Sequence, residues 1–427
     1  MKRRLLGVTI ICVLGISLML GTSSLGAQEI TLSFWDRETA VTGPATEALI
    51  AGFEKENPNI HIEWRKVPYD QYDDLAKMAY LVGEGPDLGS VCSMYTTWEL
   101  LEKGCIMDLT DWYREYGDRF PLAADPYIKS PGGVYCTIPL AMHTMKHIFY
   151  NVEILENYGI AVPMNSWGEF LEACETLKNQ GVTPATMGAK EYAPCEHWWQ
   201  MFLTETVGAA EINSMLYRKY PDKGPRWTDP GWIRSLKYFL ELFQRGYISK
   251  EAVTIGWASS ILPFTTGKVA FFFDGSWLAG MLPPEFNWGF FEFPHIIGEL
   301  GYTRNDGVVA YMSQVQVAAT APRDAAFKFL EYWTRPENQK VRWEKVKEIP
   351  ATIGAVDPKE FDPYTRACVE FAETCTGSYP WISAVLPPEV GLDALGNGYG
   401  SLITGETTIP ELSKKLEEVH QRVLREE

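Results

Sequence analysis

The chain has 427 residues and a formal net charge of −17 at neutral pH. So acidic a surface repels nucleic acid and anionic lipid, which argues against both as partners. The length is enough for two domains with substantial cores, and the irregular spacing of the cysteines excludes a disulfide scaffold or a CxxC metal site.

The first residues have the pattern of a secretory signal peptide, predicted over 1–27. Basic residues at positions 2–4 precede an apolar run over 5–20, and small or polar residues follow to Ala27. The run is shorter than the ~20 apolar residues that span a bilayer. The pattern therefore predicts export to the periplasm, with a retained membrane anchor as the alternative. The cleavage position stays open, because Leu25 occupies a place where a smaller residue is usual.

The mature chain begins with a strand, a helix and a second strand. Apolar and polar residues alternate over 30–35 and again over 60–64. Between them, apolar residues recur at helical spacing until Asn57-Pro58 stops the helix. This order predicts a βαβ unit with parallel strands and a right-handed crossover. A further short strand is expected over 87–91.

The middle of the chain continues the alternation. Residues 134–140 and 148–150 are expected to be extended, with a possible crossing between lobes at 141–144, and helices dominate 153–245. Val269–Phe273 is a continuous apolar run, typical of a strand buried on both faces.

A further strand is predicted over 308–318, and the rest of the chain is mainly helical. The last helix is expected to begin with a capping box formed by Thr408 and Glu411. Strands and helices alternate throughout, which predicts an α/β architecture.

Five stretches, taken together and in order, resemble extracellular solute-binding protein family 1. They are ITLSFWD with FEKENPNIHIEW, GEGPDLG with LLEKGCIMDLTDW, VYCTIPL with FYNVEILENYGI and NSWGEFLEACETLKNQG, PFTTGKVAFFFDGSW, and FLEYWTRPENQ with EIPA. The resemblance implies a two-lobed periplasmic-binding-protein fold. Each lobe would be a mainly parallel sheet flanked by helices, with the ligand cleft between the lobes.

The family fold also implies how the chain divides between the lobes. The N-terminal lobe would contain 28–140 and 276–313, and the C-terminal lobe would contain 141–275 and 314–427. Hinge crossings are expected near 140–143, near 274–275 and near Ser313.

Ligands of open α/β sheets bind beyond the carboxyl ends of the strands, and the family places contacts at the same strand tips and at the hinge. A sugar offers hydroxyls to polar side chains and apolar C–H faces to aromatic rings, and the chain has 15 Trp and 21 Tyr. Most of these aromatic residues are expected to be core packing. The tryptophans chosen as candidates occupy loop-like or element-end contexts. The candidate ligand-binding residues are Asp36, Arg37, Glu38, Tyr95, His143, Trp198, Trp199, Trp257, Ser276, Trp277 and Trp381.

The resemblance implies a monomeric substrate-binding subunit of an ABC importer, with a carbohydrate ligand and membrane permease subunits as partners. No cofactor and no metal are expected, and the protein is predicted not to be an enzyme. P-loop, GxSxG and HExxH motifs are absent from the sequence.

The alternatives left open are a secreted carbohydrate-active enzyme that uses a carboxylate pair and a ligand-sensing receptor subunit. The identity, length and charge of the sugar also stay open, and Arg37 would permit an anionic sugar if it lies in the cleft. Whether Cys92 and Cys105 form a disulfide also stays open.

Overall fold

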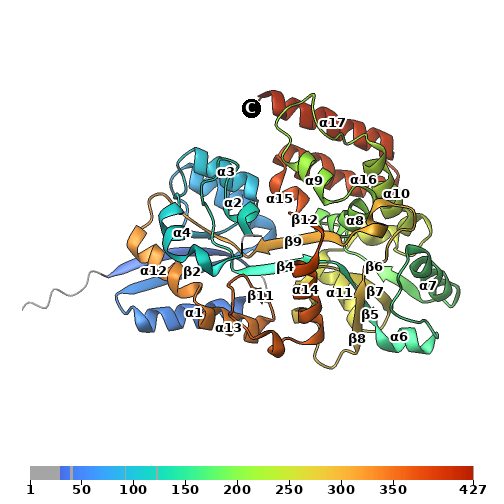
Figure 1. Ribbon diagram of the computed structural model, residues 1–427, viewed down its shortest axis with the longest axis horizontal. Helices are drawn as coiled ribbons and strands as arrows, with labels where there is room; N and C mark the ends of the chain where they lie inside the picture. Colours follow the sequence, from blue (N-terminus) through green and yellow to red (C-terminus); the bar gives the residue numbers. More distant parts are fainter. Residues whose placement is uncertain (1–28, 39–41, 92, 122–123, 427) are drawn as a thin grey trace, which may run out of the picture.

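The computed structural model describes residues 29–38, 42–91, 93–121 and 124–426. The predicted signal peptide and Cys92 lie outside these residues. The described part forms three four-stranded sheets with helices packed around them, which confirms the two-lobed α/β fold. In Figure 1 the first lobe holds the N-terminal strands and the second lobe holds most of the C-terminal half of the chain.

The first lobe is built on the sheet β10-β3-β1-β2. Its strands are β1 (Ile30–Glu38), β2 (Ile60–Pro68), β3 (Leu88–Ser90) and β10 (Val315–Val317). Strand β1 is parallel to β2 and to β3, whereas β10 is antiparallel to β3. The alternating apolar residues put one face of β1 in the core, and helix α1 (Gly43–Glu56) makes the crossover to β2. The predicted βαβ unit is therefore confirmed.

The two lobes are joined by a sheet of order β11-β4-β9-β12. Its strands are β4 (Ala141–Met145), β9 (Asp306–Met312), β11 (Ile349–Pro350) and β12 (Gly377–Tyr379). Strands β4 and β9 are antiparallel and run from one lobe to the other (Figure 1). The predicted strand over 308–318 is divided into β9 and β10 by Ser313, whose φ of 52° lies in the left-handed region.

The second lobe contains the sheet β6-β7-β5-β8. Its strands are β5 (His147–Asn151), β6 (Thr183–Thr186), β7 (Val269–Phe273) and β8 (Trp288–Glu292). All five residues of β7 are buried, as its continuous apolar run predicts. However, β5 is antiparallel to both β7 and β8, and only β6 with β7 is parallel. This sheet is therefore mixed rather than mainly parallel.

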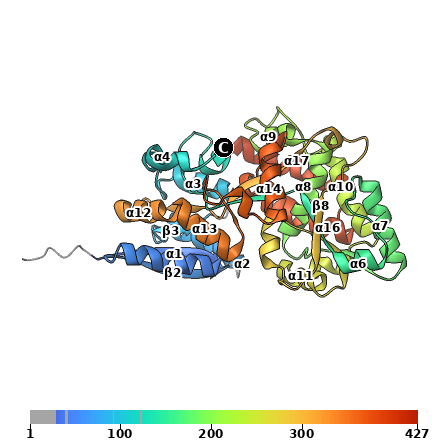
Figure 2. The ribbon, with the colours of Figure 1, turned by 60° about the horizontal axis from the view of Figure 1, so that its bottom comes forward.

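The strand and helix contacts differ from the expected division of the chain between the lobes. Strand β8, from the segment expected in the N-terminal lobe, pairs with β5 of the second lobe. Strand β10 pairs with β3, and helices α12 (Arg323–Trp333) and α13 (Pro336–Val346) pack on α1 in the first lobe. Figure 2 shows α12 and α13 beside α1 from a second direction. Sheet membership depends on long-range pairing, which local periodicity does not encode.

The remaining helices complete the two lobes. The first lobe adds α2 (Tyr69–Leu81), α3 (Met94–Glu102), α4 (Thr110–Tyr116) and α5 (Asp125–Ile128). The rest of the chain forms α6 (Val152–Asn157), α7 (Trp167–Asn179), α8 (Tyr192–Thr206), α9 (Ala209–Leu216), α10 (Pro230–Gln244), α11 (Trp257–Thr265), α14 (Pro363–Thr374), α15 (Ile382–Val385), α16 (Asn397–Thr404) and α17 (Ile409–Glu426). The capping box at the start of α17 is confirmed, because Glu411 N donates to Thr408 Oγ1 and Thr408 N donates to Glu411 Oε2.

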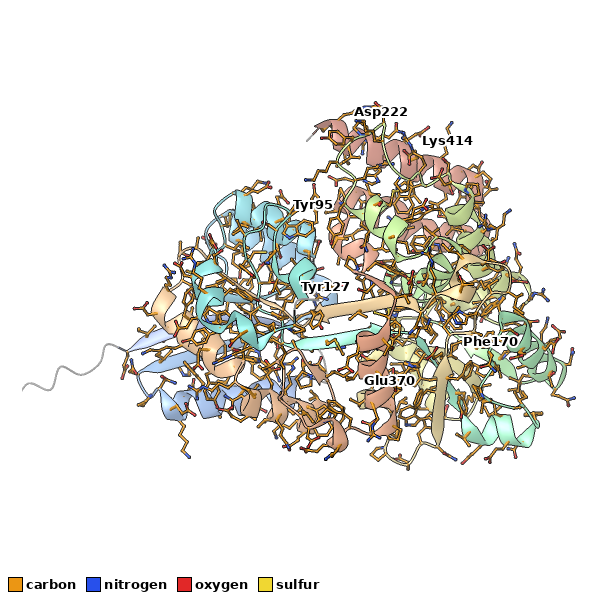
Figure 3. The ribbon with its side chains drawn as sticks, viewed as in Figure 1. Tyr95, Tyr127, Phe170, Asp222, Glu370 and Lys414 are labelled. Atoms are coloured by element: carbon orange, nitrogen blue, oxygen red, sulfur yellow. The ribbon has the colours of Figure 1, made fainter. Side chains whose placement is uncertain are left out.

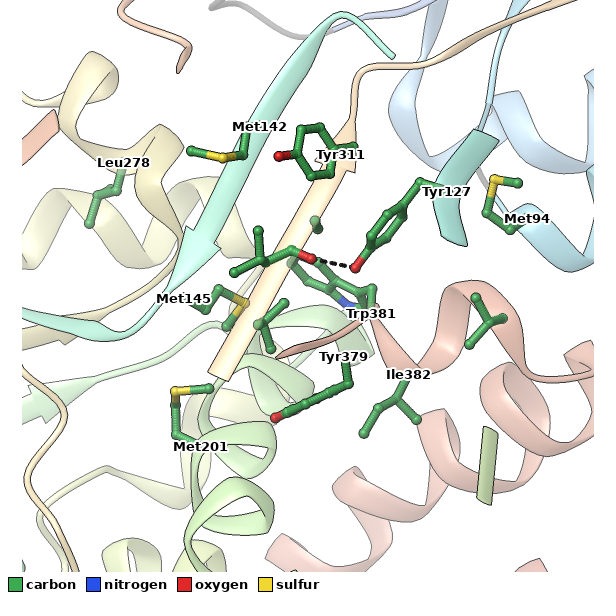
Figure 4. Packing of buried hydrophobic residues seen from close by; sticks show 14 of the residues in the cluster. Met94, Tyr127, Met142, Met145, Met201, Leu278, Tyr311, Tyr379, Trp381 and Ile382 are labelled. Atoms are coloured by element: carbon green, nitrogen blue, oxygen red, sulfur yellow. Dashed lines mark hydrogen bonds between the residues drawn. The ribbon is translucent and has the colours of Figure 1, made fainter. Parts of the chain in front are cut away.

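The core extends between the lobes around the crossing strands. Figure 4 shows Tyr127, Tyr379 and Trp381 close to β9, with the Tyr127 hydroxyl donating to the Val309 carbonyl. Tyr95 and Tyr127 lie on the side of the first lobe that faces the second (Figure 3). Among the described residues, no helix combines the length and the apolar character that a membrane crossing needs.

Candidate functional site

Four aromatic side chains meet where the second lobe joins the crossing strands. Trp277 stacks on Trp381 with ring centroids 5.5 Å apart and planes 29° from parallel. His143 on β4 and His197 on α8 each meet the Trp277 ring edge-on at 5.4 Å. The four residues come from four separate elements, so the cluster exists only when the second lobe and the crossing strands are assembled.

The turn after β7 positions Trp277 by close packing on a glycine. A Cβ on Gly275 would lie 2.0 Å from Cζ3 of Trp277, so only glycine lets the indole approach the backbone this closely. The preceding residue, Asp274, accepts a hydrogen bond from Gly275 N at 2.9 Å and one from Trp257 Nε1 at 2.7 Å. The sequence Asp274-Gly275-Ser276-Trp277 therefore builds a fixed carboxylate and an oriented indole beside each other.

Helix α8 contributes two buried polar residues whose hydrogen-bonding capacity is only partly used. His197 Nδ1 lies 2.7 Å from Asp274 Oδ1, and His197 Nε2 has no hydrogen-bond partner among the described residues. Glu196 accepts from Ser383 N at 2.8 Å through Oε1, and the Trp381 side chain lies near this carboxyl, but Oε2 makes no well-aligned hydrogen bond in the described part. Burial raises the pKa of the Glu196 carboxyl. Buried polar atoms without hydrogen bonds are costly, so a polar ligand that reached Glu196 Oε2 and His197 Nε2 would gain free energy.

A second polar cluster lies where the first lobe meets the crossing strands. Ser90 Oγ, at the tip of β3, donates to Asp36 at 2.6 Å, at the tip of β1. Glu348 binds Arg342, with Arg342 Nε 2.6 Å and Nη2 2.5 Å from its Oε2. His143 Nε2 lies 3.7 Å from Glu348 Oε1, which joins this cluster to the aromatic one.

Burial and neighbouring charges shift the pKa values of the ionisable groups in this second cluster. Burial pushes the pKa of Glu348 upward, but the neighbouring Arg342 guanidinium outweighs it and holds that pKa below its ordinary value. Burial raises the pKa of Asp36 and lowers the pKa of His143, which favours the neutral imidazole. Glu348 and Arg342 thus form a buried ion pair whose two charges cancel.

Several predicted residues lie in or beside these clusters. Besides Asp36, His143, Trp257, Trp277 and Trp381, the structure brings in Ser276, whose hydroxyl accepts from Thr144 N at 3.2 Å. Tyr95 is half-buried on α3 and faces the second lobe (Figure 3).

Two predicted residues at the tip of β1 are not brought into the clusters. Arg37 forms an ion pair with Asp73 on α2 at 3.3 Å. The side chain of Glu38 lies outside the described residues.

Trp198 and Trp199 differ from the expectation that they occupy a loop or an element end. Both are 1 % exposed within α8, whose residues from Pro194 to Thr206 are all buried. Trp198 packs on Phe273 at 5.2 Å, and Trp199 Nε1 donates to Ser235 Oγ at 2.8 Å. Both rings are core packing, because α8 is buried on all sides and only part of its surface meets Trp277.

Five residues of these clusters were not predicted from the sequence: Glu196, His197, Asp274, Arg342 and Glu348. Glu196 and His197 carried a signal: two ionisable residues lie inside the otherwise apolar segment that contains Cys195, Trp198 and Trp199. Lys, Glu and Asp are almost never fully buried unless they are paired or functional. Glu348 and Arg342 carried no local signal, because their segment reads as an ordinary charged helix end.

Two hollows lie apart from these clusters. One, of about 370 Å³, is shared by both lobes and is lined by Trp98, Tyr127, Lys129, Ser130, Pro131, Asn213, Tyr217, Ser378, Tyr379 and Pro380. The other, of about 510 Å³, lies on the second lobe between the start of α7 and β8. Neither hollow is lined by a predicted site residue.

The described residues hold no group of three or more His, Cys, Asp or Glu side chains arranged to bind a metal ion. Cys105 is a free thiol, and its proposed partner Cys92 lies outside the described part of the chain.

Known proteins share this fold and part of this sequence. A chitin oligosaccharide binding protein superposes with a TM-score of 0.83 at 21% identity, covering 93% of this chain and 99% of that one. The xylose/arabinose-binding protein XacG of Haloferax volcanii is 27% identical over 64% of this chain and 59% of its own length. An uncharacterised ABC transporter extracellular-binding protein of Pyrococcus horikoshii is 24% identical over 55% of this chain. The match spans about half of that relative, 53% of its length.

The family comparison covers a larger share of the chain than the two sequence relatives do. The model of the bacterial extracellular solute-binding proteins matches residues 38–340, from the tip of β1 to α13. This range includes β4, β7 and β9 and the turn that holds Trp277. The chain belongs to the bacterial extracellular solute-binding protein family.

Proposed function

We propose that the chain is the substrate-binding component of an ABC importer and that it binds a carbohydrate between its two lobes. The observation that supports this most is the stacked pair Trp277 and Trp381 next to Glu196 and His197, whose buried Oε2 and Nε2 atoms make no hydrogen bond in the described part. A sugar ring packs its C–H face on an indole and offers hydroxyls to carboxylates and imidazoles. One ligand class therefore satisfies both halves of the cluster.

The names of the relatives favour the same class. The Haloferax relative is named for xylose and arabinose, and the superposed structure is named for chitin oligosaccharides. Among the residues expected from sequence, Asp36, His143, Trp257, Ser276, Trp277 and Trp381 are the contacts that we propose, together with Glu196, His197 and Asp274. Trp198 and Trp199 are left out because they are core residues.

Binding would work by closure of the lobes around the crossing strands. Asp36 comes from the first lobe, His143 from β4 and Trp277 from the second lobe, so a ligand that contacts all three favours the closed arrangement. The closed form would then present the ligand to membrane permease subunits. We propose that the protein is a monomer, carries a cleaved leader over residues 1–27 and acts in the periplasm.

A thermal-shift panel tests this function. The purified protein is unfolded and refolded to remove carried-over ligand, and is then heated with galactose, xylotriose, raffinose and chitotriose. A ligand at one hundred times its Kd adds about 2.7 kcal/mol to the free energy of unfolding, which gives a clear rise in Tm. A saturable rise with a sugar that is recovered unchanged supports the proposal. A sugar recovered in cleaved form would favour the enzyme alternative, and no rise with any sugar would contradict carbohydrate binding.

A further inference from the structure

The charge of the ligand can be inferred from the ionic groups around the aromatic cluster. Two arginines are relevant: Arg342 belongs to the second polar cluster, and Arg37 follows Asp36 at the tip of β1 but lies outside the clusters. Each arginine already faces a carboxylate. Arg342 is 3 % exposed, with Nε and Nη2 at 2.6 and 2.5 Å from Glu348. The Arg37 guanidinium lies 3.3 Å from Asp73 on α2. A ligand carboxylate would have to compete with these existing carboxylates for either cation.

The acidic groups outnumber these cations. Asp274 is 1 % exposed and lies beside His197, and Glu196 is fully buried, with an Oε2 that makes no well-aligned hydrogen bond in the described part. Asp36 adds a third carboxyl group from the first lobe. Carboxylate oxygens accept hydrogen bonds, so these groups match hydroxyl donors. A ligand carboxylate would find no uncompensated cation among these groups, and burying a charge without a partner is costly.

We propose that the site selects uncharged saccharides and rejects the corresponding uronic acids. This inference rests on the carbohydrate-binding function proposed above and adds the charge class of the ligand. It also assigns two roles: Glu348 cancels Arg342, the deeply buried arginine of the second polar cluster, and Asp36, Asp274 and Glu196 offer oxygen atoms to ligand hydroxyls without offering a cation to an anion. The expected discrimination is about a hundredfold or more in Kd, because a ligand carboxylate would lose its water without gaining a counter-charge.

Matched sugar pairs test the inference on the full chain. Titration calorimetry at pH 7 compares galactose with galacturonate, glucose with glucuronate, and galactobiose with digalacturonate. We expect one neutral sugar to bind and its acid to bind at least a hundredfold more weakly. An acid that binds as tightly as its neutral partner, or more tightly, overturns the inference and leaves carbohydrate binding intact. Binding by neither member of any pair, with no response in the wider sugar panel, refutes the proposed function and the inference with it.

Charge-removing variants test the assigned roles. Glu348→Gln leaves Arg342 uncancelled, so the acid-to-neutral affinity ratio should rise at least tenfold. Asp36→Asn replaces an acidic group at a less buried position with an amide that can donate to a carboxylate, and should raise the same ratio about threefold. This second variant provides a test if Glu348→Gln folds poorly. The matched control is Glu331→Gln on α12, which removes a carboxylate bound by Arg119 and Arg335 outside these clusters and should leave the ratio unchanged. A ratio that is unchanged in both site variants contradicts the inference.

Discussion

Two tryptophans that looked alike in the sequence should respond differently to substitution. Trp198 is 1 % exposed, and its ring contacts Phe170, Phe273 and Phe293 at centroid distances of 6.4, 5.2 and 6.4 Å. Trp198→Ala removes a fully buried indole and leaves a cavity, which should lower the free energy of unfolding by about 3–5 kcal/mol. Because the ring does not contact Trp277, the Kd of the folded protein should stay within about twofold of the wild-type value.

Trp277 is half-buried and forms one wall of the aromatic cluster with Trp381, His143 and His197. Trp277→Ala removes the stacking face and opens the site to water. Aromatic anchors in desolvated sites cost about 2 kcal/mol or more when truncated, which corresponds to a roughly thirtyfold rise in Kd. Its loss of stability should be smaller than that of Trp198→Ala, since part of the indole is exposed in the folded state.

The assay pairs equilibrium urea unfolding with titration calorimetry, using the sugar that gives the largest thermal shift. Circular dichroism first shows that each variant is folded under the titration conditions. A tenfold or greater loss of affinity in folded Trp198→Ala would refute the assignment of that residue to the core. Wild-type affinity in Trp277→Ala would refute the aromatic cluster as the binding site.

Three more substitutions probe the fold and the site. Trp257→Phe removes the donor that orients Asp274, and calorimetry should show about tenfold weaker sugar binding. An unchanged Kd would mean that Asp274 does not contact the ligand. Asp87→Ala removes the acceptor for both Ser33 N and Ser33 Oγ, and should lower the free energy of unfolding in urea by about 1–3 kcal/mol with no change in Kd. A change in Kd would mean that Asp87 acts in the site. Burial lowers the pKa of His147 to about 3, so the unfolded chain takes up this proton near pH 6.5 and the folded chain does not. The stability that is present above pH 6.5 is therefore lost as pH falls toward 3, and the loss between pH 7 and pH 5 is about 2 kcal/mol. Urea titrations at these two pH values should show that His147→Phe abolishes this part of the loss. An equal pH dependence in wild type and variant would contradict the buried neutral imidazole.

The regular strands were predictable because a strand that is buried on one or both faces has an alternating or a continuous apolar sequence. Residues 30–35 and 60–64 alternate, Val269–Phe273 is uniformly apolar, and all three segments are strands at those positions. Strands β6 and β8 were not predicted. Thr183–Thr186 is a short strand with a proline, and Trp288–Glu292 is paired only at β5, so neither has a pattern of its own.

The candidate site was predictable in part from strand ends. Ser276 and Trp277 were expected from their position after the apolar run at 269–273, whereas His143 was expected from the hinge that the family resemblance implies. The structure brings these three residues together. Glu196 and His197 follow no strand, and their place in the site depends on how α8 packs. A pattern that finds strand tips therefore finds the part of the candidate site that lies on turns and misses the part that lies on helices.

The connections between the clusters explain why ligand binding and lobe closure should be one event. Glu348 lies 3.7 Å from His143 and 3.3 Å from Ser313 Oγ, the residue with left-handed backbone between β9 and β10. His143 in turn meets Trp277, so a chain of contacts leads from the strand crossing to the stacked indoles. A ligand that touched only Trp277 and Trp381 would have equal affinity for open and closed arrangements and would shift neither. Differential affinity requires contacts on both sides, and Asp36 at the tip of β1 provides a polar group on the first lobe close to this chain.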